Sequence, residues 1–259
     1  MEIITSKDNP IVKKTVSLRE SRRERIRSGL FVIEGLRLCK DAALCGADIK
    51  TVLVSEEFLK NHSEDAEIIS KYCSDVRVVS EAVSQKLGDT VNSQGIYCIC
   101  ALDNKNDNLK GTKFIALENL QDPGNIGTVI RTAEAFGLDG VVLIGNCADI
   151  YNPKVLRSTM GSLFRIPIYK FADIESANLE FKSIGLTVYG AVLDNEATFL
   201  SKTKIKEKSV CIIGNEANGM SDDAKKICDN FVIIDMHGNA ESLNAAVAAS
   251  VIMWEMAKI

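Results

Sequence analysis

The sequence predicts an α/β protein built from two parts. Strand-like and helical segments alternate along the 259 residues. A polar segment at 103–111, ending in glycine, separates two strand-like runs and is the best linker candidate in the chain. After this segment the alternation becomes regular, which is typical of a largely parallel sheet covered by helices. We therefore expect a small α/β domain over 1–105 and a second α/β domain over 111–259.

The first part combines helical patterns with short apolar runs. Helical spacing of apolar residues extends over 7–28 and again over 35–45. Four strand-like runs accompany these helices, at 30–33, 49–54, 76–79 and 95–100. This mixture predicts a compact α/β domain.

The second part contains the clearer βα alternation. Strand-like runs occur at 113–117, 140–144, 187–193, 209–213 and 231–235, with a shorter one near 166–169. Helices fit between them at 126–136, at 173–185 and from about Ser221. The apolar stretch 243–257 is too short for a confident membrane span and contains Glu255, so we expect a helix that is buried on all sides. Ligands of such sheets usually lie beyond the carboxyl ends of the strands.

Composition places the chain among ordinary globular proteins, with 46% hydrophobic and 25% charged residues. The first residues show no targeting features, which predicts a cytoplasmic protein. The eight cysteines form no C-x-x-C pair and the two histidines are isolated, so we expect reduced, mostly buried thiols and no metal site.

Charge is unevenly distributed. The chain carries a net charge of −4, but residues 1–30 contain eight basic and four acidic side chains. Such a segment could contact phosphates, although its charge alone favours a solvated helix surface.

The loop after the strand-like run 113–117 excludes two common nucleotide sites. Residues 118–125 contain neither G-x-G-x-x-G nor G-x-x-x-x-G-K-[ST]. Dinucleotide-binding and P-loop functions therefore lose support.

Three segments of the second part could carry chemistry. In 125–137, Asn125 suits a helix N-cap and Gly137 a helix stop, while Arg131 points away from the apolar stripe. This pattern by itself favours a surface arginine paired with Glu134.

The other two segments each follow a predicted strand. In 212–221 a short apolar run is followed by Gly214 and Glu216. This pattern supports a ligand site and a simple turn equally. In 233–250, Ser242 could cap the last helix. Asn244 then lies one turn inside an apolar helix, where a buried amide needs partners.

In order, these segments resemble the SpoU (TrmH) family of the SPOUT RNA methyltransferases. The matching elements are N-x-G-x-x-x-R-T-A-E-A-F-G at 125–137, G-x-E-x-x-G at 214–219 and G-x-x-x-S-L-N-x-x-V-A at 238–248, and the stretch 157–167 also looks like that family. The first part is more loosely similar to the substrate-binding domain of these enzymes, through 4–10 and 31–35.

The resemblance implies an RNA ribose 2′-O-methyltransferase that uses S-adenosylmethionine, with 23S rRNA favoured over tRNA as substrate. It also implies a SPOUT α/β domain with a deep trefoil knot, and a homodimer. RNA rather than DNA is implied because only RNA has the 2′-hydroxyl. The alternatives are a tRNA 2′-O-methyltransferase and a noncatalytic RNA-binding dimer; a Rossmann-like methyltransferase for small molecules is disfavoured by the missing glycine-rich loop.

The resemblance also implies site residues. The cofactor pocket would be formed, largely through backbone groups, by Gly214, Ile234, Met236 and Leu243. The catalytic and RNA-positioning set would be Asn125, Arg131, Glu216, Ser242 and Asn244. The chain departs from the family pattern at Asp235, where proline is usual, and at Ala245, where valine is commoner.

Overall fold

The computed structural model describes residues 2–89, 93–103, 108–194 and 197–258. The chain folds into two compact units. An N-terminal unit combines Met1–Asn104 with Tyr151–Phe164, and a C-terminal unit combines Lys105–Ile150 with Arg165–Ile259. Part of the predicted linker, 104–107, lies outside the described residues.

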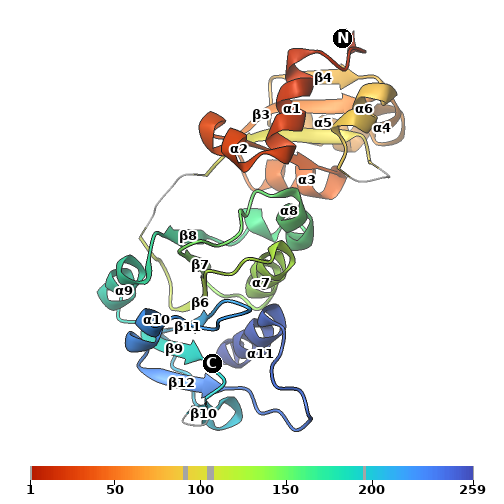
Figure 1. Ribbon diagram of the computed structural model, residues 1–259. Coiled ribbons are helices and arrows are strands. Elements are labelled where there is room, and N and C mark those ends of the chain that lie inside the picture. The colour runs from red at the N-terminus through yellow and green to blue at the C-terminus, as the bar shows by residue number, and fades with distance from the viewer. Residues whose placement is uncertain (1, 90–92, 104–107, 195–196, 259) are drawn as a thin grey trace. The chain divides into compact units, whose positions relative to one another are not determined.

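The N-terminal unit contains a mixed five-stranded sheet (Figure 1). Its strand order is β1-β4-β3-β5-β2, with β1, β4 and β3 parallel and β5 antiparallel to both of its neighbours. The strands are β1 (Ile3–Ile4), β2 (Leu30–Glu34), β3 (Ile49–Ser55), β4 (Val76–Val79) and β5 (Ile96–Ala101). All four predicted strands are confirmed; β1 is too short to show a period in the sequence.

Helices cover this sheet, and one prediction about them is wrong. The pattern at 7–28 forms two helices, because Ser21 is extended (φ −117°, ψ 112°) and its side chain accepts a hydrogen bond from the Glu24 N–H. Arg25, only 3% exposed, donates to the Leu18 carbonyl and stabilises this bend. The helices are α1 (Pro10–Glu20), α2 (Arg22–Ser28), α3 (Leu36–Leu44), α4 (Glu56–Asn61), α5 (Ser63–Ser70), α6 (Glu81–Leu87), α8 (Pro153–Thr159) and the 3₁₀ turn η1 (Ser162–Phe164).

The segment 151–164 belongs to the N-terminal unit through aromatic contacts. The Phe31 ring lies 4.4 Å from the Tyr151 ring and 6.5 Å from the Phe164 ring, between centroids. Residues that follow the predicted linker therefore contribute to the core of the first unit.

The C-terminal unit is built on a seven-stranded, all-parallel sheet in the order β10-β12-β9-β11-β6-β7-β8. The predicted α/β class is confirmed. The strands are β6 (Lys113–Glu118), β7 (Gly140–Ile144), β8 (Ile168–Phe171), β9 (Thr187–Ala191), β10 (Thr198–Phe199), β11 (Ser209–Ile213) and β12 (Asn230–Ile233). The run predicted at 231–235 ends two residues early, and the loop that follows begins at Ile234.

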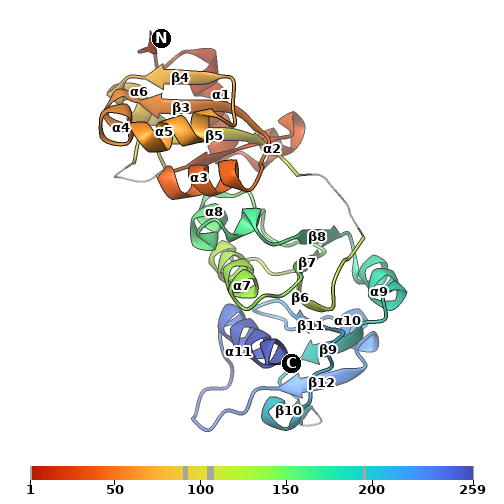
Figure 2. The same ribbon diagram turned by 180° about the vertical axis from the view of Figure 1, so that it is seen from behind.

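Helices cover both faces of this sheet (Figures 1 and 2). On one face lie α7 (Pro123–Ala135) and α11 (Ala245–Ala257), which pack against each other and against the central strands. On the other lie α9 (Ile174–Ser183) and α10 (Asp222–Lys226). Alternate strand residues point to opposite faces, so Phe114 and Ala116 of β6 pack in one buried cluster with Phe181 of α9. A short 3₁₀ turn, η2 (Leu200–Lys202), follows β10.

The last helix is not buried on all sides, which corrects the sequence prediction. Ala249 and Met253 are fully buried, but Val247 is 49% and Trp254 is 53% exposed. An apolar stripe of α11 therefore faces outward, because the neighbouring helix α7 covers only part of its circumference. In the part of the chain that the structure describes, no helix combines the length and apolar character that crossing a bilayer requires.

The cysteines are free thiols, and most are buried as expected. Burial raises the pKa of Cys100 well above its usual value, and burial with nearby carboxylates raises the pKa of Cys228 to about 12. Both therefore stay protonated at neutral pH. Among the described residues, no group of three or more potential ligands could hold a metal ion.

Candidate active site

Three loops meet at the carboxyl edge of the parallel sheet in the C-terminal unit. Strands β6 and β11 are adjacent, with Leu117 opposite Ile213 at their ends, so the loops that follow them are neighbours. The third loop, 234–244, leads from β12 into α11 (Figure 2). The first loop leads into α7 and the segment 125–137, and the other two loops contain the remaining segments singled out in the sequence.

Glu216 is the centre of a hydrogen-bond network between these loops. Its carboxylate accepts from the side-chain amide of Asn125 at 3.0 Å. It also accepts from the backbone N–H groups of Asp122 (3.0 Å) and Gln121 (3.2 Å). One carboxylate thus ties the turn after β11 to the first turn of α7.

Asn244 extends the network to the third loop. Its Nδ2 donates to Oδ1 of Asn125 at 3.0 Å, while its own Oδ1 accepts from the N–H groups of Ala246 and Val247. The N–H groups at the start of the helix therefore orient the Asn244 amide, and its Nδ2 in turn orients the Asn125 amide. The Nδ2 of Asn125 then points toward a position that needs an acceptor. Glu216 is that acceptor. The three predicted residues form one directional chain.

Two predicted helix caps are wrong in detail. Asp122, not Asn125, caps α7: it accepts from the Asn125 N–H at 2.9 Å, and Pro123 occupies the first helical position. Asn244, not Ser242, caps α11, so this amide lies at the start of the helix rather than inside it. The Ser242 side chain is exposed and makes no hydrogen bond with the described residues.

Arg131 lies on α7, beyond the network. It is exposed and forms no hydrogen bond or ion pair with other described residues. Glu134, its expected partner, instead contacts Arg165 at 3.1 Å. A guanidinium without an internal partner remains available to an external anion.

The network affects the ionisation of Glu216. Partial burial alone would raise the pKa of its carboxyl, but the hydrogen bonds from Asp122, Asn125 and Gln121 outweigh that effect. The pKa of Glu216 therefore lies below its usual value, and the group is an anion at neutral pH.

The predicted cofactor residues surround the same edge. Gly214 is buried where its own loop folds back: a Cβ there would lie 2.2 Å from the backbone of Gly219 and Met220. The fold of the turn is by itself a sufficient reason for glycine at this position. Ile234, Met236 and Leu243 lie in the loop 234–244, at least partly exposed.

The chemistry of this loop suits a nucleoside. The main-chain groups of Met236 and Leu243 make no hydrogen bond with other described residues. Free backbone donors and acceptors next to apolar side chains are the groups that bind an adenine ring and fix its orientation. The residues present therefore fit an adenosyl cofactor.

Comparison with known proteins identifies the family. The model of the SpoU rRNA methylase family matches residues 112–254, more than half of the chain. The chain is also 34% identical over 256 residues, with 99% of both chains covered, to RlmP of Bacillus subtilis, named a 23S rRNA (guanosine(2553)-2′-O)-methyltransferase. This chain belongs to the SpoU rRNA methylase family.

Other relatives agree with this family over nearly the whole chain. The model of the MRM3-like substrate binding domain matches residues 9–98. An AdoMet-bound rRNA methyltransferase from Sinorhizobium meliloti is 28% identical, with a TM-score of 0.88 and coverage of 99% of this chain and 97% of that one. The SpoU methyltransferase AviRb from Streptomyces viridochromogenes, in complex with AdoMet, is 25% identical, with a TM-score of 0.85 and coverage of 96% and 97%.

The sequence interpretation missed Asn119, which shapes the loop after β6. This residue has a positive φ of 52°, a conformation that asparagine tolerates better than most side chains. Its Oδ1 accepts from the Asn146 N–H at 2.8 Å, and its carbonyl accepts from Nδ2 of Asn215 at 2.8 Å. Asn119 thereby connects three loops of this SpoU domain. The one local signal was an asparagine directly after a strand.

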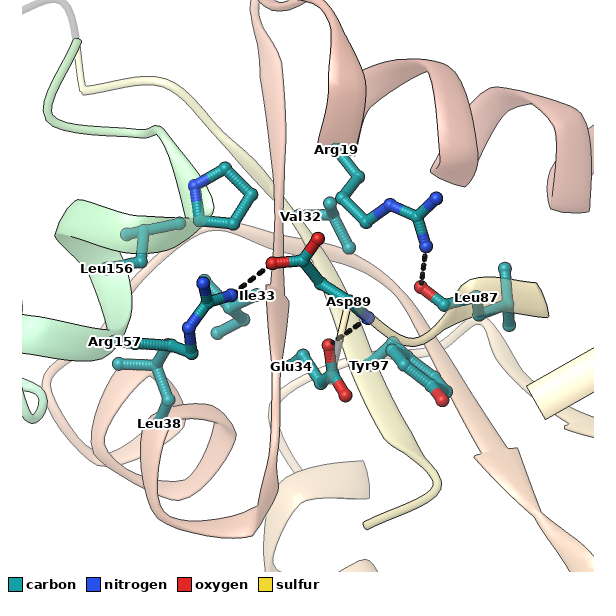
Figure 3. Close-up of a pocket in the computed structure, with 11 residues that line it drawn as sticks. Arg19, Val32, Ile33, Glu34, Leu38, Leu87, Asp89, Tyr97, Leu156 and Arg157 are labelled. Atoms are coloured by element: carbon teal, nitrogen blue, oxygen red, sulfur yellow. Dashed lines mark hydrogen bonds and ion pairs between the residues drawn. The ribbon is translucent and has the colours of Figure 1, made fainter. Parts of the chain in front are cut away.

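A small cavity in the N-terminal unit is separate from these residues (Figure 3). Arg19, Asp89 and Arg157 contribute its charged lining, together with Glu34. Arg157 pairs with Asp89, and Arg19 donates to the carbonyls of residues 86–88. The charges are satisfied internally, and none of the predicted site residues lines this cavity.

Proposed function

We propose that this protein transfers a methyl group from S-adenosylmethionine to a ribose 2′-hydroxyl of ribosomal RNA. One observation carries the proposal: Glu216, Asn125 and Asn244, from three separate segments, form a single oriented network at the carboxyl edge of a parallel sheet. An oriented, satisfied polar network of this kind is a suitable frame for positioning reactants. Membership of the SpoU family supports the same reaction.

In this proposal the loop 234–244 and Gly214 form the cofactor pocket. The main chains of Ile234, Met236 and Leu243 would bind the adenosyl group, and Gly214 would shape the floor through its close packing. S-adenosylmethionine supplies an activated methyl group when bound. Glu216, Asn125 and Asn244 keep the surrounding loops in place, and Ser242 presents an exposed hydroxyl on the loop 234–244.

Arg131 would bind RNA at this site. A guanidinium has donor N–H groups and no acceptor atom, so Arg131 cannot take the proton from the ribose hydroxyl. It can donate two parallel hydrogen bonds to a phosphate and stabilise negative charge that develops on the attacking oxygen. Its lack of an internal partner among the described residues supports this role.

The N-terminal unit would select the RNA. Two basic side chains of the predicted segment, Arg19 and Arg25, are used internally on backbone carbonyls. In contrast, Arg22 and Arg23 on α2 are exposed and pair with no described residue. We propose that these two arginines contact RNA phosphates, with a division of labour between a substrate-binding domain at 1–105 and a methyltransferase domain at 111–259.

Three further properties belong to the same proposal. The exposed apolar stripe of α11 would pair with a second copy of the chain to give a homodimer. The C-terminal portion would form the trefoil knot expected of SPOUT methyltransferases, and the protein would act in the cytoplasm. DNA is not an expected substrate, since the reaction needs a 2′-hydroxyl.

Ribosomal RNA is favoured over tRNA by RlmP, whose name specifies a 23S rRNA nucleotide and which aligns over the full length of this chain. Several other relatives carry the broader description of tRNA/rRNA methyltransferase, which keeps tRNA as the second candidate. Mapping ribose methylation in rRNA and in tRNA distinguishes the two substrates.

The test combines cofactor binding with mapping of ribose methylation. Calorimetry should detect S-adenosylhomocysteine binding to the full-length protein, and ribose methylation mapped in cells with and without the gene should change at one 23S rRNA nucleotide. Methylation lost only from tRNA would support the tRNA alternative instead. RNA binding with no cofactor binding would leave the noncatalytic RNA-binding dimer.

A further inference from the structure

The loop 234–244 is anchored at its two ends. Asn244 fixes its end through the helix cap and the bond to Asn125. Asp235 fixes its start by accepting from Ser201, through the hydroxyl at 3.0 Å and the backbone N–H at 3.2 Å. Between these anchors, residues 236–243 make no hydrogen bond with any described residue.

The contact with Ser201 follows from the register of the sheet. Strands β10 and β12 are parallel, with Thr198 opposite Val232 and Phe199 opposite Ile233. Two residues further along each chain, the same offset brings Ser201 opposite Asp235. The carboxylate thus continues the pairing of the two strands after the regular backbone ladder has ended.

The ionisation of Asp235 is consistent with this contact. Desolvation favours the neutral acid, but the two hydrogen bonds from Ser201, the backbone N–H of Asp235 itself and the nearby His237 together outweigh it, so that the pKa of Asp235 lies below its usual value. A charged acceptor forms stronger hydrogen bonds than a neutral one.

We propose that Asp235 and Ser201 form a latch that holds the cofactor loop in its binding conformation. The inference rests on the proposed function, because Ile234 and Met236, which flank Asp235, are proposed to contact the cofactor. A proline at this position would restrain its backbone covalently by fixing φ. Here a pair of hydrogen bonds from a neighbouring turn restrains the loop instead. Asp235 is a positioning residue, since it acts through its neighbours.

The first test needs no ligand. Hydrogen exchange of the free protein should be followed at the hydrogen-bonded amides that border the loop, because the loop's own amides are unprotected. The Ser201 N–H, and the N–H groups of Ala246 and Val247 that Asn244 caps, should exchange faster in Asp235→Ala than in the wild type, with the exchange of β6 and β11 unchanged. Glu207→Ala is the control, because Glu207 is exposed and pairs with no described residue. Equal exchange of these bordering amides in Asp235→Ala and the wild type would overturn the latch.

The second test measures the consequence for the cofactor. Calorimetry should show that Asp235→Ala weakens S-adenosylhomocysteine binding by roughly tenfold, the effect of losing a hydrogen bond to a charged group. Asp235→Asn, which keeps one acceptor, should lose less, and Glu207→Ala should bind as the wild type does. In steady-state assays Asp235→Ala should raise KM for the cofactor with little change in kcat.

A double-mutant cycle tests whether the weaker cofactor binding comes from the contact between Asp235 and Ser201. In the Ser201→Ala background, Asp235→Ala should weaken binding less than it does in the wild type. Additive losses, or unchanged binding in Asp235→Ala, would contradict the proposal. If the wild type itself binds no S-adenosylhomocysteine, the proposed function fails, and the exchange experiment still decides whether the latch exists.

Discussion

The Glu216 carboxylate acts only as an acceptor, with donors from two backbone N–H groups, from Asn125 and, at 3.5 Å, from Nδ2 of Asn215. An ionised carboxylate has no proton of its own, so it can satisfy two backbone N–H groups and the Asn125 amide at once. A glutamine there would keep the size but present an NH₂ group to one or more of these donors. The site therefore depends on the charge as well as the shape of residue 216.

Replacing Glu216 with Gln should alter the acid stability of the protein. The pKa of Glu216 is lowered on folding, so its contribution to stability is present above the unfolded pKa and is lost as pH falls through the folded pKa. Melting temperatures measured from pH 7 down to pH 3 should show a wild-type advantage over Glu216→Gln that shrinks below about pH 4.5, near the ordinary pKa of glutamate. An advantage that stays constant over this range would contradict the network.

Arg131 supports a different kind of prediction, because it forms no hydrogen bond or ion pair with the residues that the structure describes. Arg131→Ala and Arg131→Lys should each change the free energy of unfolding by less than about 0.5 kcal/mol. Both should lower kcat/KM by about a hundredfold or more, since lysine keeps the charge but cannot form the planar, two-pronged contact. The check is a methylation assay beside denaturant melts. Near-normal activity of Arg131→Lys would show that the guanidinium geometry is dispensable.

At the scale of elements, two helix N-termini converge on the network. Helix α7 begins after Asp122, whose N–H donates to Glu216, and α11 begins after Asn244, whose amide reaches Asn125. Helix capping and site assembly thus share the same side chains. A change at one cap should therefore affect both stability and function.

Asn244 allows these two effects to be separated. Asn244→Ala should destabilise the protein by about 1 kcal/mol, the usual cost of losing an N-cap, and should also lower activity. Asn244→Ser keeps a capping hydroxyl but cannot reach Asn125 in the same way. We expect it to retain most of the stability in thermal melts while losing activity comparably to the alanine variant. Matching activity in Asn244→Ser and the wild type would argue against a role for the bond to Asn125.

At the scale of the whole molecule, the exposed stripe of α11 marks the proposed dimer surface. Val247→Glu should convert a dimer into a monomer in analytical ultracentrifugation, because it places a charge in an apolar contact. The position is the third of its helix, where glutamate is compatible with folding. Leu179→Glu on α9 is the matched control, since Leu179 is 68% exposed on the other face of the sheet. A wild-type monomer, or a dimeric Val247→Glu variant, would contradict the proposal.

Most of the strands could be predicted, because apolar runs between turn residues depend on local sequence. The central strands β6, β7 and β11 appear where the pattern predicted them. The failures occurred where individual side-chain contacts override the periodic pattern. Ser21 ends one helix and caps the next, and Arg25 is buried on carbonyls rather than free for RNA. Periodicity also predicted a fully buried α11. An all-apolar helix has the same sequence pattern whether or not its own chain covers every side of it, so the pattern did not indicate the exposed Val247 and Trp254.

The sequence by itself determined the α/β class, the order of the strands along the chain and the segments proposed to carry the chemistry. These properties depend on local patterns, and Asn125, Glu216 and Asn244 belong to recognisable motifs. Only the tertiary structure decided that these three side chains form one oriented network, that Asp122 and Asn244 are the caps, and that Asp235 meets Ser201. The caps are local, but their choice depends on where each helix begins. The network and the contact of Asp235 with Ser201 join residues from different segments, and the register of parallel strands, which a sequence does not display, brings those segments together.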